Sequence, residues 1–312
     1  MKKILMVSEK WCDANPEMGL SNHYHNLFGA LKHSKLDVDF KIVHFDETRM
    51  IHNNHIDNIL PKIVKKYSPD IIMVSLLGKY PFNPSLNCLS QCKNQSKSKL
   101  CFIWCDTGND WGKPQINQIG DVADLHISWD VPSDQPLRNN HINLWTPEDS
   151  KLFYFEPNKK VDLSFIGSPR YQDRAMCLQY LIQKGLPIMV RGGQREQKLI
   201  PEQYASFLRG TKISINFSHS PDGIFQLKGR VLESLASGCL LLEQDNAHTN
   251  SMFEDGKDFV SFKNPDELAN KAKYYLEYDD ERKKIAIAGN KKFIENYTAE
   301  HYWKKVFERL EK

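Results

Sequence analysis

The chain has 312 residues, of which 40% are hydrophobic and 26% are charged, and its formal net charge is +3. Roughly 100–200 residues make one domain, so this length predicts two domains with a core each. The composition is that of an ordinary globular protein and excludes a disordered chain, a fibrous repeat and a disulfide-stabilised miniprotein. The charge is too small to indicate a nucleic-acid binder, and no stretch approaches the roughly 18 apolar residues of a membrane span.

The N-terminus and the cysteine count favour a cytoplasmic location. The apolar run 2–8 imitates the start of a signal peptide, but Glu9, Lys10 and Asp13 end it before a cleavage site could form. We therefore expect this run to be a first strand. Seven cysteines, an odd number without an export signal, are typical of reduced thiols in a reducing compartment.

Four of the cysteines have a spacing that has to be compared with a zinc site. Cys88 and Cys92, and then Cys101 and Cys105, form pairs with three residues between the members. Zinc ribbons prefer pairs separated by two residues on tight turns. Residues 100–105 also read as a buried strand, in which cysteine packs as a small hydrophobic residue. We expect structural thiols and no metal.

Strands and helices alternate through the first half of the chain, which is typical of a parallel α/β sheet. Ser21 is a candidate N-cap of the first helix. The apolar patterns predict helices at 21–31, 56–67 and 85–95, and strands at 2–8, 38–44, 71–76, 100–105, 123–129 and 142–145.

The second half repeats this alternation. The predicted strands are 162–166, 187–191, 213–217 and 239–243, and the predicted helices are 170–184, 201–208, 228–237, 265–278, 280–297 and 299–310. We expect two Rossmann-like α/β domains joined near 146–160, with a cleft between them as the ligand site. The expected boundaries are 1–150, 151–296 and a C-terminal helix at 297–312 that packs back on the first domain through its aromatic side chains.

Residues 212–245 carry the clearest functional signal. They read as a strand, a polar loop and a helix that opens with Lys228, Gly229 and Arg230. Free N–H groups and a partial positive charge favour anions at a helix N-terminus, and two cations there suit a diphosphate. Glu233 lies one turn later, where a carboxylate can accept both hydroxyls of a ribose. The alternatives are a solvated helix start for the cations and a surface position for Glu233.

This segment resembles the nucleotide-sugar motif of GT-B glycosyltransferases of the CgeB-like and group 1 families. The resemblance is carried by the run 228–243, then by Phe253-Glu254-Asp255-Gly256-Lys257 and Asn264-Pro265-Asp266-Glu267-Leu268, and upstream by residues 163–174. It covers essentially all of 145–300, whereas 1–144 shows only a weak likeness of strand order. The resemblance implies two Rossmann-like domains and transfer of a sugar from a nucleoside-diphosphate donor to an acceptor hydroxyl.

The resemblance assigns donor contacts to the second domain. It implies that Glu233 holds the ribose and that the cations of the helix start, with Arg174 or Arg170, neutralise the diphosphate. Residues that end the strands would complete the donor site: Gly167, Ser168, Arg191, Asn216 and Ser218. The competing interpretation is an exposed charge for Arg170 and Arg174 and a simple turn at Arg191.

The motif also departs from the family pattern. Many relatives have two glutamates separated by seven residues, and here the first of these positions is Phe225. This leaves the donor sugar and the stereochemical outcome open. GT-B enzymes generally need no bound metal, because fixed cations and a helix end stabilise the departing diphosphate. Asp37-Val38-Asp39 has the spelling of a metal motif but begins a strand early in the first domain.

Candidates for acid–base chemistry lie in the first domain. Asp106 directly follows a strand and is our first candidate for the general base that an inverting enzyme needs, followed by His126 and Asp13. Each of these could instead be a cap or turn residue.

Two further residues are candidates for acceptor contacts. Gly19 suits a close approach of the backbone to a ligand, although an ordinary turn fits equally well. His23 lies at a polar helix start, and it points to a different face from His25, which argues against a shared metal.

The sequence leaves two other functions open, a non-catalytic nucleotide-sugar-binding protein or a GT-B epimerase or phosphorylase. It does not identify the acceptor, for which a glycan, a lipid-linked molecule and a protein are candidates. Peripheral contact with a membrane is compatible with the sequence.

Overall fold

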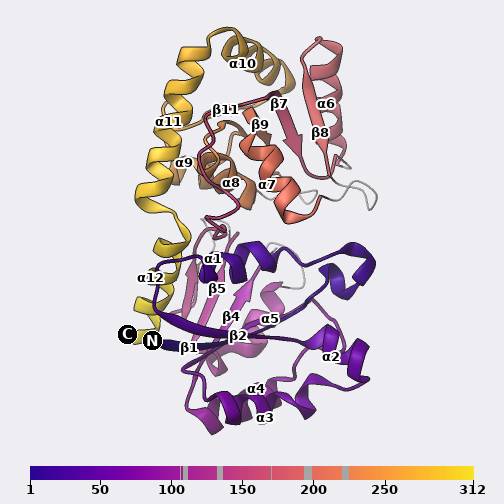
Figure 1. Cartoon of the computed structure of the whole chain (residues 1–312), viewed down its shortest axis with the longest axis vertical. Helices are drawn as coiled ribbons and strands as arrows, with labels where there is room; N and C mark the ends of the chain where they lie inside the picture. Colours follow the sequence, from indigo (N-terminus) through magenta and orange to yellow (C-terminus); the bar gives the residue numbers. More distant parts are fainter. Residues whose placement is uncertain (106, 108–111, 132–135, 170, 193–198, 220–224) are drawn as a thin grey trace. The chain divides into compact units, whose positions relative to one another are not determined.

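The computed structural model describes the whole chain except residues 106, 108–111, 132–135, 170, 193–198 and 220–224 (Figure 1). The described residues form two compact units. The first contains Met1–Asn22, Lys35–Leu144 and Trp303–Lys312, and the second contains His23–Ser34 and Trp145–Tyr302. Each unit is built on its own parallel sheet, so the α/β class predicted from the alternation of strands and helices is confirmed.

Six parallel strands form the sheet of the first unit, in the order β2-β1-β3-β4-β5-β6. Their bounds are Lys2–Ser8 (β1), Val38–His44 (β2), Ile71–Ser75 (β3), Lys99–Trp104 (β4), Leu125–Ser128 (β5) and His141–Asn143 (β6). All residues of β3 are buried, as expected for a central strand covered by helices on both faces. Every strand end lies within two residues of the sequence prediction.

The helices of the first unit depart further from expectation. They are α2 (Phe45–His52), α3 (Leu60–Tyr67), α4 (Leu86–Ser96) and α5 (Gly112–Ile119), with short 3₁₀ helices η1 (Cys12–Ala14), η2 (Pro16–Met18), η4 (Ile56–Asn58) and η5 (Gly120–Val122). The predicted helix 56–67 is split into η4 and α3, because Pro61 fits only the first turn of a helix. The eight-residue helices α2 and α5 were not predicted.

The cysteines of the first unit are mostly core residues. Cys88 and Cys92 lie on α4 and belong to the hydrophobic core, and Cys101 is buried on β4. All seven cysteines of the chain lie within the described residues, and all are free thiols. The described residues also hold no group of three or more side chains placed to bind a metal ion.

Five parallel strands form the sheet of the second unit, in the order β11-β10-β9-β7-β8. Their bounds are Val161–Ile166 (β7), Ile188–Arg191 (β8), Thr211–Asn216 (β9), Leu240–Gln244 (β10) and Val260–Phe262 (β11). The chain leaves β7 toward β8 on one side and then returns to β9 on the other. This reversal is a topological switch point, where open α/β sheets bind ligands beyond the carboxyl ends of their strands.

The helices of the second unit agree closely with the periodic segments of the sequence. They are α6 (Gln172–Gln183), α7 (Pro201–Arg209), α8 (Gly229–Ala236), α9 (Ala247–Met252), α10 (Pro265–Glu277), α11 (Asp279–Asn296) and the start of α12 (Ala299–Glu311). The short elements α9 and β11 were not predicted.

The segment His23–Ser34 also belongs to the second unit but is not the predicted regular helix. It forms a π-helix, η3 (Tyr24–Gly29), followed by the short α1 (Ala30–Lys32). Ser21 is not its N-cap, because the Ser21 hydroxyl donates instead to Glu9 Oε1 at 2.7 Å. The backbone of Gly29 approaches Asp149 so closely that a Cβ there would lie 2.2 Å from the carboxylate.

The C-terminal helix α12 contributes its last part, Trp303–Lys312, to the first unit. Trp303 is fully buried and stacks on Phe307. Lys2 of β1 pairs with Glu311 at 2.7 Å and lies over the Phe307 ring. No helix in the described part of the chain combines the length and apolar character that a membrane span requires.

Candidate functional site

The carboxyl ends of β7 and β9 bring together several residues predicted to bind the donor. Gly167 follows β7 with φ +152°, and its N–H donates to Arg191 O at 2.8 Å. A Cβ on Gly167 would lie 2.7 Å from Arg230 Nη2. Glycine is therefore required here for two reasons: its backbone conformation, and the close approach of the Arg230 guanidinium.

The start of α8 presents the second part of the site. Lys228 is the residue before the helix, with an extended backbone, and Gly229 and Arg230 form its first turn. Lys228 Nζ donates to Gln226 Oε1 at 2.6 Å. A Cβ on Gly229 would lie 3.4 Å from Thr146 Cγ2, an ordinary van der Waals contact. The free N–H groups and the two cations make this helix end electropositive.

Two guanidinium groups are held beside this helix end. Arg230 Nη1 donates to Asn216 Oδ1 at 2.7 Å, and the Arg230 guanidinium lies over the Phe165 ring. Arg174, on α6, is buried and donates to Ser168 O at 2.9 Å. Burial and the charge of Arg230 lower the pKa of Arg174 to about 10, so it remains a cation at neutral pH. Arg174 is therefore not the exposed charge of the competing interpretation.

A buried carboxylate that the sequence did not reveal lies behind these cations. Glu243, on β10, is fully buried and accepts hydrogen bonds from Asn216 Nδ2 at 2.7 Å, from Asn246 Nδ2 at 3.1 Å and from the Ser218 hydroxyl. Burial raises the pKa of Glu243 to about 7, although these hydrogen bonds and the charge of Arg230 oppose the shift. The predicted donor residues Asn216 and Ser218 thus bind a carboxylate of the protein itself.

Glu233 is enclosed by side chains rather than exposed on the helix surface. It is 5% exposed, its Oε2 accepts a hydrogen bond from the Tyr204 hydroxyl, and His25 Nε2 lies 3.5 Å from its Oε1. Burial and the negative charge of Glu233 raise the pKa of Tyr204 well above its usual value, so the phenol stays protonated and donates. Neither Tyr204 nor His25 was predicted to contact Glu233, because they lie far from it in sequence.

A second acid near Glu233 was also not predicted. Glu148 is buried, and its Oε1 accepts from the Ala299 N–H at 3.3 Å. Burial, with a contribution from the charge of Glu233, raises the pKa of Glu148 well above its usual value. Burial therefore favours the neutral form of the Glu148 carboxyl group.

The first-unit candidates for acid–base chemistry have a different outcome. The structure disfavours His126 as a base, because it is completely buried on β5 and both ring nitrogens are bonded. The Trp104 Nε1–H donates to its Nδ1 at 3.1 Å, and its Nε2 bonds Gly120 O at 2.9 Å. Burial lowers the pKa of His126, which keeps this ring neutral.

The roles proposed for Asp13, Gly19 and His23 stay predictions. Asp13 is exposed in η1 with φ +54°, and Gly19 closes the same loop with φ +72°. His23 is buried in the second unit, immediately before η3. The predicted base Asp106 and the predicted phosphate ligand Arg170 lie outside the described residues.

One carboxylate in the first unit was overlooked. Glu9 directly follows β1, beside the switch point between β1 and β3, and its buried Oε2 has no hydrogen-bond partner among the described residues. Burial raises the pKa of Glu9 to about 6, partly offset by the bond from Ser21.

Comparison with known proteins identifies the family. Residues 153–308 match the family model described as "Glycosyl transferase-like", which is half of the chain. The chain belongs to the glycosyl transferase-like family. The predicted resemblance to GT-B glycosyltransferases is confirmed by this match. No curated protein matches the sequence significantly.

Solved structures confirm the GT-B fold of this family member. Anabaena Alr3699/HepE in complex with UDP-glucose is similar with a TM-score of 0.66 and 11% identity over 100% of both chains. A glycosyltransferase from Rickettsia africae ESF-5 gives 0.60 and 12%, covering 99% of this chain and 97% of its own. Sucrose-phosphate synthase from Thermosynechococcus elongatus gives 0.59 and 11%, covering 99% of each chain.

Proposed function

We propose that the chain transfers a sugar from a nucleoside-diphosphate sugar, specifically a UDP-sugar, to an acceptor hydroxyl. The observation that carries this proposal is the placement of Arg230 and Arg174 beside the start of α8, at the switch point of the second sheet. Such an arrangement of cations and helix N–H groups binds a diphosphate. HepE, which has the same fold, was crystallised with UDP-glucose, and this supports the choice of nucleotide.

Different residues at the start of α8 would bind different parts of the donor. Lys228 and Arg230, with Arg174, would neutralise the diphosphate and stabilise the charge that develops on it as the sugar leaves. Glu233 would accept the ribose hydroxyls. A carboxylate has about four lone-pair sites, so Glu233 can keep its bond from Tyr204 and still accept from a ligand.

The acceptor side rests on the first unit. A glycan, a lipid-linked molecule or a protein would supply the hydroxyl, and a carboxylate would remove its proton if the reaction inverts the anomeric centre. Asp106 and Asp13 remain the candidates for this base, and Glu9 joins them because it ends β1 with a pKa of about 6. Because the cations already balance the diphosphate, we propose that catalysis requires no metal ion.

Calorimetric titration with UDP tests the proposal. A charge-assisted hydrogen bond contributes about 1.5–3 kcal/mol, so Arg230→Ala and Lys228→Ala should each weaken UDP binding about tenfold to a hundredfold. Lys284→Ala removes an exposed lysine of α11 and should leave the affinity unchanged. A wild-type chain that binds no UDP, or α8 variants that bind as tightly as the control, would reject the assignment.

A further inference from the structure

Glu243 is a buried carboxylate in the second unit that the proposed function does not use. It pairs with Asn216 across the parallel strands β10 and β9, so the two side chains emerge on the same face of the sheet. Asn216, Asn246 and Ser218 all donate to it. A fully buried carboxylate with three donors is a built feature, because leaving it unpaired would be costly.

The bonds of Asn216 connect Glu243 to the anion site. An ionised carboxylate only accepts hydrogen bonds, so Glu243 must face the Asn216 amide nitrogen, which it does at 2.7 Å. The Asn216 oxygen is then turned toward Arg230 Nη1, also at 2.7 Å. Glu243 therefore determines which end of the amide Arg230 meets. With an apolar residue at 243, the amide could rotate and the guanidinium would lose its fixed acceptor.

Few charges act on Glu243. Arg230 of α8 and Arg174 of α6 interact with it electrostatically. The side chains that bond it are uncharged: Asn216 at the end of β9, Ser218 beyond that strand, and Asn246 before α9. Ser261 of β11 lies opposite it in the register. α11 also packs against β10, and the charged side chain among its buried residues, Arg282, is paired with Asp279. Burial is thus the largest influence on the pKa of Glu243, and Arg230 is the charged group that most favours its ionised form among the described residues.

We propose that Glu243 is a positioning residue for the donor diphosphate, which orients Arg230 through Asn216 and gains a proton when an anion binds beside Arg230. A bound diphosphate places negative charge near the carboxylate and offsets the Arg230 field that stabilises its ionised form. Ionised Glu243 and the ligand compete for the same cation. Since burial raises the pKa of Glu243 to about 7, this coupling would operate near neutral pH. The inference rests on the proposed function, because it requires a diphosphate at this site.

Calorimetry with UDP-glucose in two buffers of different ionisation enthalpy counts the protons. UDP-glucose is the probe because its diphosphate has no group that titrates near neutral pH. The wild type should take up roughly a third to a half of a proton at pH 7, and its affinity should fall as the pH rises from 7 to 8. Glu243→Gln should take up none and should bind at least as tightly as the wild type at pH 8. Glu277→Gln, the same change at an exposed site on α10, should behave as the wild type.

A second variant tests the orienting role. Glu243→Leu should weaken UDP-glucose binding about tenfold at every pH, because Arg230 loses its fixed partner. Its thermal unfolding shows whether the fold is retained, and Glu243→Gln keeps the test decisive if the leucine variant fails to fold. Equal proton uptake by wild type and Glu243→Gln would overturn the inference while the proposed function stands. A wild type that does not bind UDP-glucose would overturn both.

Discussion

Glu233 shows how a single carboxylate can be prepared for a ligand. Tyr204 of α7 donates to one of its oxygens, and His25 of η3 approaches the other at 3.5 Å. Tyr204 and His25 also contact each other and the Phe153 ring, so aromatic groups surround the carboxylate. This enclosure fixes the carboxylate in advance, which would lower the entropy lost if Glu233 binds a ribose as proposed.

Removing the Tyr204 hydroxyl tests this preparation. Tyr204→Phe should weaken UDP binding about threefold to tenfold, because one net hydrogen bond that fixes Glu233 is lost. Inorganic diphosphate lacks a ribose, so its affinity should not change, and Glu233→Ala should show the same contrast more strongly. Tyr278→Phe, at an exposed tyrosine, is the matched control. Equal losses for UDP and inorganic diphosphate, measured by calorimetry, would refute a ribose role for Glu233.

At the scale of the element, Gly167 between β7 and α6 allows the end of β7 to approach the start of α8 closely. The loop turns with φ +152° and leaves room for Arg230 from α8, so the end of one strand and the start of a distant helix are fitted to each other. A side chain at this position would oppose both features. Gly185, after α6, has φ +74°, and a Cβ added there would meet no described atom within 4 Å. It is therefore a control for backbone strain without a clash.

Replacing each of these two glycines by alanine should distinguish the cost of backbone strain from the effect of displacing Arg230. Gly167→Ala and Gly185→Ala should each lower the free energy of unfolding by about 1–2 kcal/mol, because both put a Cβ on a positive-φ backbone. Only Gly167→Ala should also weaken UDP binding, by about tenfold, since its Cβ would displace the Arg230 guanidinium. Chemical denaturation and calorimetry measure the two effects. A Gly185→Ala variant with the same loss of affinity would contradict the argument.

The elements that the sequence predicts are long periodic helices and apolar runs that polar residues delimit. β1, β7 and β9 are short apolar runs bounded by polar residues, and α10 and α11 span 13 and 18 residues. α9, β11 and α2 have six, three and eight residues, and their sequences show no clear apolar period. The π-helix η3 was predicted as an ordinary helix because its apolar spacing is helical, and its wider turn appears only in the backbone hydrogen bonds.

At the scale of the molecule, the sequence predicts only those residues of the candidate site that lie close together in the chain. Lys228 directly precedes α8 and Arg230 and Glu233 lie on it, so their spacing alone predicts a common ligand. Glu243 and Tyr204 are 10 or more residues away on other elements, and no period connects them to α8. The membership of His23–Ser34 in the second unit is likewise a tertiary fact, fixed by contacts such as His33 Nδ1 to Asp149 Oδ1 at 2.7 Å.

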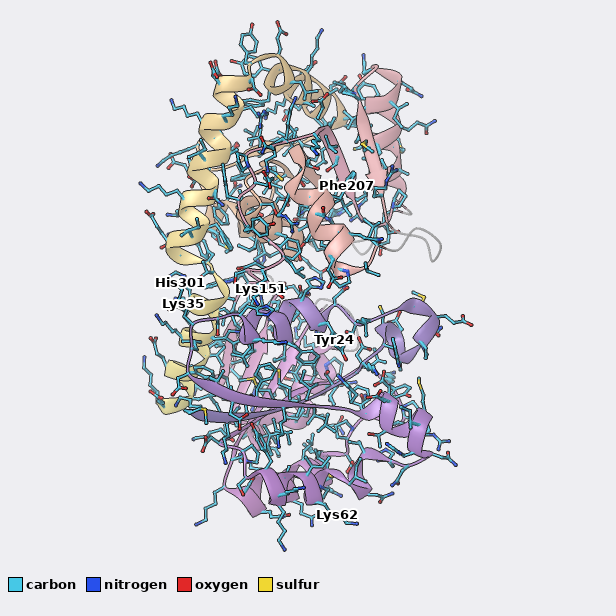
Figure 2. All side chains as sticks on the ribbon, viewed as in Figure 1. Tyr24, Lys35, Lys62, Lys151, Phe207 and His301 are labelled. Atoms are coloured by element: carbon cyan, nitrogen blue, oxygen red, sulfur yellow. The ribbon has the colours of Figure 1, made fainter. Side chains whose placement is uncertain are left out.

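The positive charges of the second unit also lead to a prediction about whether donor binding requires a metal ion. Figure 2 draws the side chains on the ribbon and labels Phe207 of α7. The Arg191 guanidinium lies over the Phe207 ring, 5.9 Å from its centroid. Arg191, the last residue of β8, thus adds a further cation to Lys228 before α8, Arg230 in its first turn and Arg174 on α6. Fixed cations of this kind replace a divalent ion as the counter-charge of a diphosphate.

We therefore expect UDP-glucose binding to be independent of divalent ions. Affinity measured by calorimetry in EDTA should agree within about twofold with affinity in Mn²⁺, because the guanidinium groups remain charged in both. Arg230→Ala is the informative companion variant, since loss of a fixed cation should make binding weaker in EDTA and partly recoverable with Mn²⁺. A wild-type affinity at least tenfold higher in Mn²⁺ than in EDTA would show that the protein cations are not sufficient and that the donor binds as a metal complex.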